Sequence, residues 1–163
     1  MDSVQILTRK LVLLAASVIV AAFLVIQLVP YGRDHSNPPV TMEPSWDSPI
    51  TRDLVVNACF DCHSNQVVWP WYSNIAPVSW WVQDHVDEGR SELNFSEWDR
   101  NQEEAHESTE TILEGEMPPS YYKPWSRMSQ TELDNLITGL EATLGTSART
   151  ERHRDDDDDD DDD

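Results

Sequence analysis

The sequence predicts an all-α protein in which a single N-terminal transmembrane helix precedes one helical domain. Three observations lead to this fold class. Residues 11–29 are apolar and uncharged apart from the polar Ser17 and Gln27. Later apolar residues recur at helical spacing behind capping serines, and no segment alternates as a strand does. The chain of 163 residues has the length of one ordinary domain.

The apolar segment, residues 11–29, has the length of a membrane span. At about 1.5 Å per residue it is roughly 28 Å long, close to the ~30 Å hydrocarbon thickness of a bilayer. Arg9 and Lys10 precede it, which predicts that residues 1–10 stay in the cytoplasm and that the rest is exported. A cleaved signal peptide is the alternative. Because the run ends VIQLVPYGRD without a small-x-small site, an uncleaved anchor is favoured.

Three further regions follow the anchor. Residues 30–47 are rich in proline and poor in aliphatic residues, which predicts an extended tether or wrapping strand. Residues 48–145 carry the helical patterns and form the predicted globular domain. Residues 146–163 end in nine aspartates and are predicted to be disordered by self-repulsion.

The first helical signals of the globular domain surround its only cysteines. Ser48 and Pro49 are typical of an N-cap and an N1 position, and they predict a helix ITRDLVVNACFDCH with the cysteine motif on its last turn. The next segment, VVWPWYSNIAPV, is interrupted by Pro70 and Pro77 and is predicted to be a loop. A second helix is expected over residues 78–90.

Two serine-led signatures predict the remaining helices. Ser96 with Asp99 has the spacing of a capping box and predicts a third helix running to about Leu113. Ser129 with Glu132 predicts a fourth, QTELDNLITGLEATL, which ends at a glycine. Four apolar residues of this helix fall on one stripe that is expected to face the core: Leu133, Leu136, Ile137 and Leu140.

The charge balance excludes one class of partner. The chain holds 31 Asp and Glu against 11 Lys and Arg. Without the nine terminal aspartates, the remaining acids still outnumber the basic residues two to one. Such a surface repels nucleic acid and favours partners with basic faces, and it is equally what a merely soluble surface looks like.

The chemistry of the domain centres on the motif CFDCH, with Cys59, Cys62 and His63. A zinc site needs four ligands, normally a second Cys/His pair, and the chain has no further cysteine. A thiol–disulfide oxidoreductase places C-x-x-C at a helix N-terminus within a βαβ unit, which is not the pattern here. A covalent haem suits every residue: two thiols three apart add to the two vinyl groups, and His63 becomes the proximal iron ligand. One covalent haem c is therefore predicted, on the side of the membrane to which the anchor exports the domain.

The second axial ligand of the iron must come from elsewhere in the chain. Met117 is favoured because it follows a helix end at Gly115 and precedes two prolines, which would hold its thioether in a rigid loop. His85 is the main rival, although a histidine on the inner edge of a helix is more often structural. The full set of candidates is Met42, Met117, Met128, His35, His85 and His106.

Several longer strings resemble a bacterial family of membrane-anchored monohaem c-type cytochromes, the haem-binding-domain family. They are QLVPYGRDHSNPPV, CFDCHSNQVVWPWYSNIAPVSWWVQDHVDEGRSELNFSEW, GEMPPSYY and MSQTELDNL, and together they cover most of residues 27–140. The resemblance implies an all-α, cytochrome c-like fold that wraps the haem. It also implies haem attachment through Cys59, Cys62 and His63, with Met117 as distal ligand.

These observations predict an electron carrier rather than an enzyme. Two filled axial positions leave no site for a substrate and suit one-electron transfer. The expected setting is the periplasmic or extracellular side of the cytoplasmic membrane, with redox proteins as partners. One alternative is a haem sensor or peroxidase-like enzyme with an open or labile distal site. Another is a haem subunit of a larger respiratory or photosynthetic complex.

Overall fold

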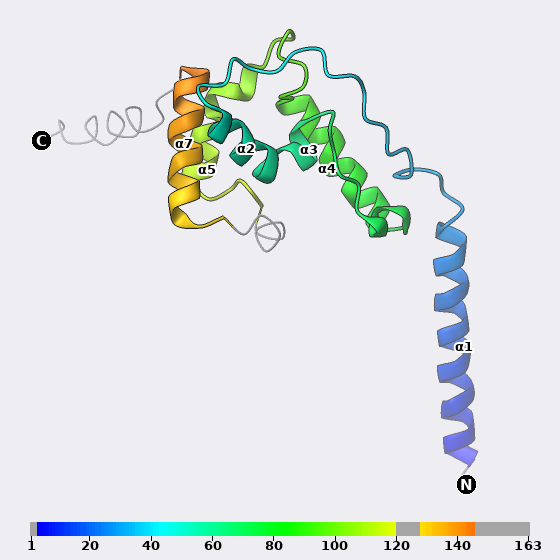
Figure 1. Cartoon of the computed structure of the whole chain (residues 1–163). Coiled ribbons are helices and arrows are strands. Elements are labelled where there is room, and N and C mark those ends of the chain that lie inside the picture. The colour runs from blue at the N-terminus through cyan, green and yellow to red at the C-terminus, as the bar shows by residue number, and fades with distance from the viewer. Residues whose placement is uncertain (1–2, 120–127, 146–163) are drawn as a thin grey trace, which may run out of the picture. The chain divides into compact units, whose positions relative to one another are not determined.

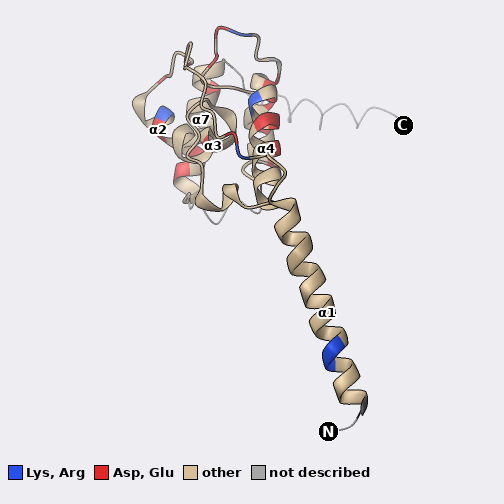
Figure 2. Cartoon of the chain, turned by 90° about the vertical axis from the view of Figure 1, so that its right-hand side faces the viewer, with Lys and Arg blue, Asp and Glu red and all other residues tan. Residues whose placement is uncertain are grey.

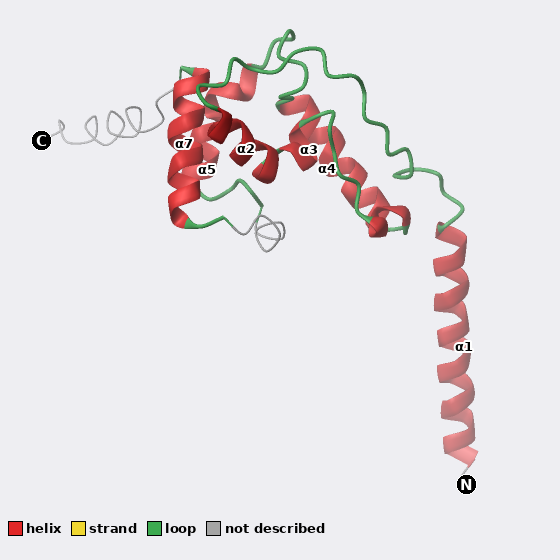
Figure 3. Ribbon diagram, viewed as in Figure 1, coloured by secondary structure: helices red, strands yellow, loops and turns green. Residues whose placement is uncertain are grey.

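The computed structural model describes residues 3–119 and 128–145 of the chain (Figure 1). The elements in these residues are helical, and none is a strand (Figure 3), which confirms the all-α prediction with an N-terminal apolar helix. The tail predicted to be disordered, residues 146–163, lies outside the described residues.

The N-terminal helix α1, Ser3–Ile26, begins before the predicted span and ends three residues earlier than expected. Its segment Val4–Ile26 is long and apolar enough to cross a membrane, and none of the most apolar window is buried within the protein. Because the described residues leave this apolar window unburied, α1 differs from a core helix, which packs its apolar face. Arg9 and Lys10 are the only charged residues of α1 and lie towards its N-terminal end (Figure 2).

The chain divides into two compact units, and each is described by itself. The first unit comprises residues 1–36 and 69–85. It holds α1, a short 3₁₀ turn η1, Trp71–Asn74, and the first half of helix α4, Val78–Glu92. The predicted loop around Pro70 and Pro77 is therefore confirmed, with one 3₁₀ turn inside it.

Of the described residues, the second unit holds 37–68, 86–119 and 128–145, which include most of the predicted globular domain but not its residues 69–85. Its helices are α2, Pro49–Ala58; α3, Phe60–His63; η2, Glu103–Glu107; α5, Ser108–Leu113; and α7, Gln130–Leu144. Figure 1 shows α2, α5 and α7 beside one another, and their inner faces share one hydrophobic core. The fully buried members of that core are Val55, Phe95, Leu136, Ile137 and Leu140.

Two of the predicted helix starts are confirmed in atomic detail. The Ser48 hydroxyl accepts a hydrogen bond from the backbone N–H of Thr51, with Pro49 in the first turn. Ser129 and Glu132 form the complete reciprocal capping box that opens α7. Each signal lies within four consecutive residues, so it does not depend on distant parts of the chain.

Helix α7 meets α2 at a glycine. A Cβ atom on Gly139 would lie 2.2 Å from the Thr51 hydroxyl oxygen, so only glycine permits this approach. The close contact brings the buried stripe of α7 against the core residues of α2. It thereby holds α2, and with it the cysteine motif that follows α2, in a fixed place.

The predicted third helix is wrong in its start. Ser96 does not cap a helix: it is fully buried in an irregular segment, and its hydroxyl accepts a hydrogen bond from the backbone N–H of Asn65 at 3.0 Å. Asp99 instead contacts the hydroxyl of Thr41. The chain becomes helical only at η2 and α5 and stops, as expected, before Gly115, whose φ is 79°. Hydrogen bonds to distant residues therefore overrode a plausible local cap.

Residues 37–47 run along the second unit with fixed partners. The backbone N–H of Thr41 donates to the Ser96 carbonyl at 2.9 Å, and Asp47 donates from its backbone N–H to the Thr143 hydroxyl. Between them, the Glu43 carboxylate pairs with Arg52 at 2.7 Å. These contacts hold residues 41–47 of the proline-rich segment against the second unit.

Candidate functional site

The motif CFDCH forms a helical turn of its own. Helix α2 ends at Ala58, and Cys59, with φ −121°, separates it from α3. The prediction of a single helix ending in the motif was therefore wrong by one break at Cys59. The Cys59 carbonyl accepts from the backbone N–H groups of Cys62 at 3.1 Å and His63 at 2.8 Å. One turn thus brings both free thiols and the imidazole together, and both cysteines are partly buried.

The imidazole of His63 is held by a backbone carbonyl. Its Nδ1 lies 3.0 Å from the Leu93 carbonyl oxygen. A carbonyl can only accept, so Nδ1 carries the proton and the lone pair is on Nε2, the atom that can bind a metal. Burial lowers the pKa of His63, which favours the neutral ring that a metal ligand needs. In the other direction, the His63 carbonyl accepts from the backbone N–H of Phe95 at 2.9 Å.

Gly89 and Arg90 seat the end of α4 on this turn. A Cβ atom on Gly89 would lie 2.7 Å from the Cys62 carbonyl oxygen, a contact that no side chain can make without movement. Next to it, Arg90 donates from Nε to the Ser64 carbonyl at 2.8 Å and from Nη2 to the amide oxygen of Asn37 at 3.1 Å. The last turns of α4 therefore fix the motif from one side.

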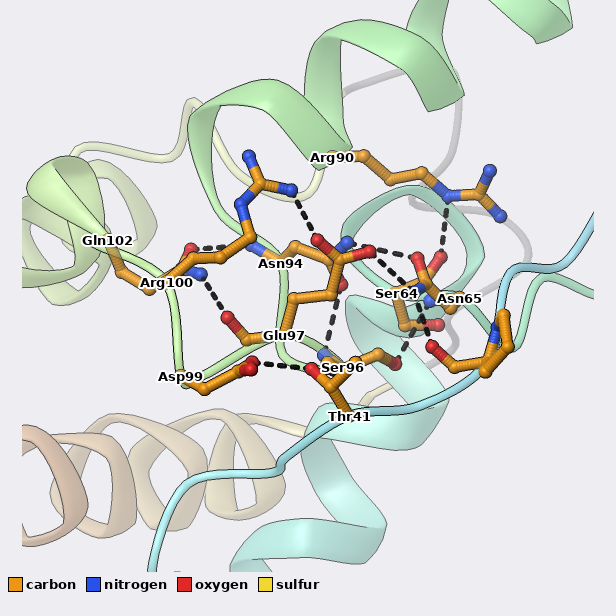
Figure 4. A network of polar contacts seen from close by, with 11 residues as sticks. Thr41, Ser64, Asn65, Arg90, Asn94, Ser96, Glu97, Asp99, Arg100 and Gln102 are labelled. Atoms are coloured by element: carbon orange, nitrogen blue, oxygen red, sulfur yellow. Dashed lines mark hydrogen bonds and ion pairs between the residues drawn. The ribbon is translucent and has the colours of Figure 1, made fainter.

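A polar network connects Asn65, which follows the motif, with residues 94–102 (Figure 4). The Asn94 amide donates to the Asn65 amide oxygen at 3.0 Å. The Asn65 amide in turn donates to the Pro39 carbonyl at 3.1 Å and to the Glu97 carboxylate at 2.8 Å. Asn65 and Asn94 are each 2 % exposed, and Ser96 is fully buried, so these bonds are shielded from competing water.

The network links the segment that follows His63 to the segment that follows Leu93, whose carbonyl binds the imidazole. Asn65 lies two residues after His63, and Asn94 directly follows Leu93, whose carbonyl accepts the imidazole N–H. The Gln102 amide closes the outer side by accepting from the backbone N–H of Asn94 at 2.9 Å. Holding these segments together holds the acceptor in place for Nδ1, which is the usual role of groups behind a metal ligand.

Burial weakens the case for thiol–disulfide chemistry. Burial raises the pKa of Cys59 to about 12, and burial together with the Asp61 charge raises the pKa of Cys62 to about 11. A thiol–disulfide oxidoreductase needs the opposite shift, towards the thiolate. Within residues 3–119 and 128–145, no cluster of three or more His, Cys, Asp or Glu side chains could hold a metal ion, which also weakens the zinc alternative.

The structure places the candidate distal ligands in different surroundings. Met117 follows α5, its backbone N–H bonds to the Thr111 carbonyl at 3.1 Å, and its side chain is 40 % exposed. Met42 is 51 % exposed, whereas Met128 packs against the core. The backbone bond holds Met117 at the helix end, as the sequence led us to expect. Its binding to iron stays a prediction.

The three histidine candidates have partners of their own. His35 stacks on Trp69 and lies 3.1 Å through Nε2 from the Ser73 carbonyl. His85 lies 2.8 Å through Nδ1 from the Trp81 carbonyl, within one turn of α4. His106 is largely exposed beside a glutamate. The contact with the Ser73 carbonyl therefore occupies Nε2 of His35.

Sequence reasoning missed the residues that support the turn. No local motif marks these residues, which are Asn65, Asn94, Gly89 and Arg90. Each of them contacts a residue that lies 26 to 30 positions away in the chain. A signal was nevertheless present. Gly89 and Arg90 fall within HVDEGR, Asn94 falls within LNFSEW, and Asn65 lies two residues after the motif. All four belong to the long string that carried the family resemblance.

Comparison with known proteins gives one match. The model of a family described as haem-binding domain matches residues 21–142, about three quarters of the chain. No curated protein and no solved structure matches the chain. The matched region includes the C-x-x-C-H turn, the loop after α5 and most of α7. The chain therefore belongs to the haem-binding-domain family and is a haem-binding protein.

Proposed function

We propose that the protein is a membrane-anchored monohaem c-type cytochrome that carries single electrons on the exported side of the cytoplasmic membrane. The observation that carries this proposal is the C-x-x-C-H turn, in which the Leu93 carbonyl holds the imidazole through Nδ1 and directs the lone pair to Nε2. This is the arrangement that a haem held by two thioethers and one histidine requires.

The residues present fit that group. The thiols of Cys59 and Cys62 would each form a thioether with one vinyl group, the S–H adding across the double bond, so that no further atom is needed. His63 would bind the iron through Nε2, and Met117 would supply the second protein ligand. When bound, the haem provides a one-electron couple at its iron, and a His/Met pair raises its potential. The chain would hold the group through its two cysteines and supply the two iron ligands.

The setting follows from the anchor and the surface charge. Arg9 and Lys10 before the apolar segment favour a cytoplasmic N-terminus. The haem domain then lies on the periplasmic or extracellular side. Its excess of acidic residues attracts redox partners with basic faces, and association slows as salt increases because the attraction is screened.

A second function depends on whether Met117 binds the iron. If the Met117 thioether does not bind the iron, or leaves it readily, the open position could take a gas or a peroxide. The domain would then act as a haem sensor or a peroxidase-like enzyme. The backbone bond from Met117 to Thr111 at 3.1 Å favours the carrier, because it fixes the methionine at the end of α5.

Absorption of the oxidised protein tests the choice. The carrier predicts a low-spin spectrum with a sulfur-to-iron band in the far red, which is lost in Met117→Ala. Met42→Ala is the matched control, because Met42 is similarly exposed and is expected to leave the band unchanged. A high-spin spectrum of the unaltered protein, with ready binding of carbon monoxide after reduction, would contradict the carrier and support the sensor.

A further inference from the structure

Residues 69–82 carry no charge, as does the apolar segment 11–29. The stretch WPWYSNIAPVSWWV contains no Asp, Glu, Lys or Arg, although charged residues make up 26 % of the whole sequence. It also holds four of the seven tryptophans, Trp69, Trp71, Trp80 and Trp81. A core segment could have this composition, so the exposure of its side chains decides what it does.

Several of these side chains are on the surface. Trp71 is 77 % exposed and Trp81 is 45 % exposed. Ile75 and Val78 are 37 % and 41 % exposed. We call these four residues the apolar face of the first unit. Tryptophan is rarely left so exposed in water, and several large apolar side chains close together in the chain indicate a contact surface.

The apolar face is tied directly to the end of the apolar helix α1. The Gln27 side chain donates to the Ala76 carbonyl at 2.9 Å and accepts from the Ala76 backbone N–H at 3.0 Å. Both backbone groups of Ala76 are thus held by one residue just after α1. Because neighbouring Cα atoms are about 3.8 Å apart, Ile75 and Val78 must lie within roughly two residue lengths of this clamp.

A second contact also links the chain after α1 to the segment that carries the apolar face. Gly32 has φ 75°, and a Cβ atom there would lie 2.3 Å from the Ser79 carbonyl oxygen. The chain leaving α1 therefore presses against the first turn of α4, which carries Val78 and Trp81. The apolar face and the end of α1 belong to the same compact unit.

The length of α1 sets the level of this face relative to a bilayer. With Arg9 and Lys10 on the cytoplasmic side, the chain from Leu11 to Gln27 extends roughly 26 Å at about 1.5 Å per residue, close to the ~30 Å hydrocarbon region. Gln27 then lies close to the boundary between the hydrocarbon and the headgroup region on the other side. Tryptophan and tyrosine side chains concentrate at that level, because their rings are amphipathic.

We propose that the apolar face, Trp71, Ile75, Val78 and Trp81, inserts into the headgroup region of the same bilayer that α1 spans. A lipid surface is the occupant that the clamp indicates, because Gln27 brings the face to the membrane boundary and the face itself is uncharged. This inference rests on the membrane anchor of the proposed function but not on the haem. It gives the chain a second membrane contact, so that residues 69–82 lie on the bilayer surface.

Photolabelling from lipid tests the proposal. The full chain is reconstituted into phosphatidylcholine vesicles that contain a phospholipid with a diazirine near its headgroup, irradiated, digested and analysed by mass spectrometry. We expect label in peptides from α1 and from residues 69–82, and none in the peptide of α7. In the double variant Trp71→Ser/Trp81→Ser, label in residues 69–82 is lost and label in α1 remains. Ile50→Ser, at a position 67 % exposed in the other unit, is the control that leaves the labelling unchanged.

The outcomes separate this inference from the proposed function. Label in α1 but none in residues 69–82 would overturn the inference, keep the anchor and leave the face to a protein partner. Label in neither would overturn both the inference and the anchor. Label in residues 69–82 that persists at full strength in the double variant would refute the role of the two tryptophans. Because the readout is the labelled peptide, failure of the electron-carrier proposal would appear only in the absorption spectrum.

Discussion

Replacing Asn65 with alanine removes the centre of the polar network that connects this residue with residues 94–102. The Asn65 side chain makes three hydrogen bonds: it accepts from Asn94 at 3.0 Å and donates to Pro39 at 3.1 Å and Glu97 at 2.8 Å. Alanine leaves the Asn94 amide, which is 2 % exposed, without its acceptor. The Pro39 carbonyl and the Glu97 carboxylate each lose a donor. No water can easily replace the missing group in so buried a place.

The expected loss of stability follows from these three bonds. A buried amide without a partner costs about 1–3 kcal/mol, a neutral bond about 1 kcal/mol, and a bond to a charged group about 1.5–3 kcal/mol. Because Glu97 keeps its contact with Arg100, we take the low end for that bond. The free energy of unfolding should therefore fall by about 4 kcal/mol. At about 4–8 °C per kcal/mol for a domain of this size, the melting temperature falls by at least roughly 15 °C.

Thermal unfolding of the full chain in detergent, followed by circular dichroism, measures this change. Asn135→Ala is the matched control, because Asn135 is exposed on α7 and the same substitution there should alter stability by no more than about 0.5 kcal/mol. An Asn65→Ala variant that unfolds at the temperature of the control would refute the reasoning. It would mean that the network does not hold the two segments around His63.

Three further changes test other contacts. Gly89→Ala puts a Cβ atom 2.7 Å from the Cys62 carbonyl oxygen, so we expect about 1–3 kcal/mol of destabilisation in urea unfolding; an unchanged midpoint would contradict the close approach. Ser48→Ala removes the cap of α2 and should cost about 1 kcal/mol in the same assay, and a loss below about 0.3 kcal/mol would count against the cap. The hydrogen bond from Arg52 lowers the pKa of Glu43, so this pair stabilises the fold above pH 4.5 and the contribution is lost as the pH falls through the lowered pKa. Glu43→Gln should therefore be less stable than the unaltered protein at pH 7 and equal to it at low pH, and a constant difference across that range would contradict the assignment.

Local signals made parts of this fold predictable. The caps at Ser48 and Ser129 each depend on four consecutive residues, and the apolar segment depends on composition alone. The same kind of reasoning failed at Ser96, where a serine and an aspartate three apart looked like a cap. There the hydroxyl bonds to the backbone of Asn65, 31 residues away. A bond of that separation leaves no periodic or local pattern from which it could be predicted.

At the candidate site, too, some features could be predicted from the sequence and others could not. The role of the three residues of C-x-x-C-H could be predicted because this spacing is the known signature of c-type haem attachment. The Leu93 carbonyl that fixes the imidazole of His63 could not, because any residue supplies a carbonyl and only the fold chooses which one lies 3.0 Å from Nδ1. The break at Cys59 was missed for a related reason: the helical pattern continues through it, and the change of direction depends on packing.

Covalent attachment of haem is the central claim, and the intact mass of the purified chain tests it most directly. After denaturation and acid extraction, which remove a non-covalent haem, the mass should exceed that of the polypeptide by one haem. In Cys59→Ser/Cys62→Ser this excess should be absent. A denatured chain with the mass of the polypeptide alone, or a double variant that keeps its haem, would contradict the claim.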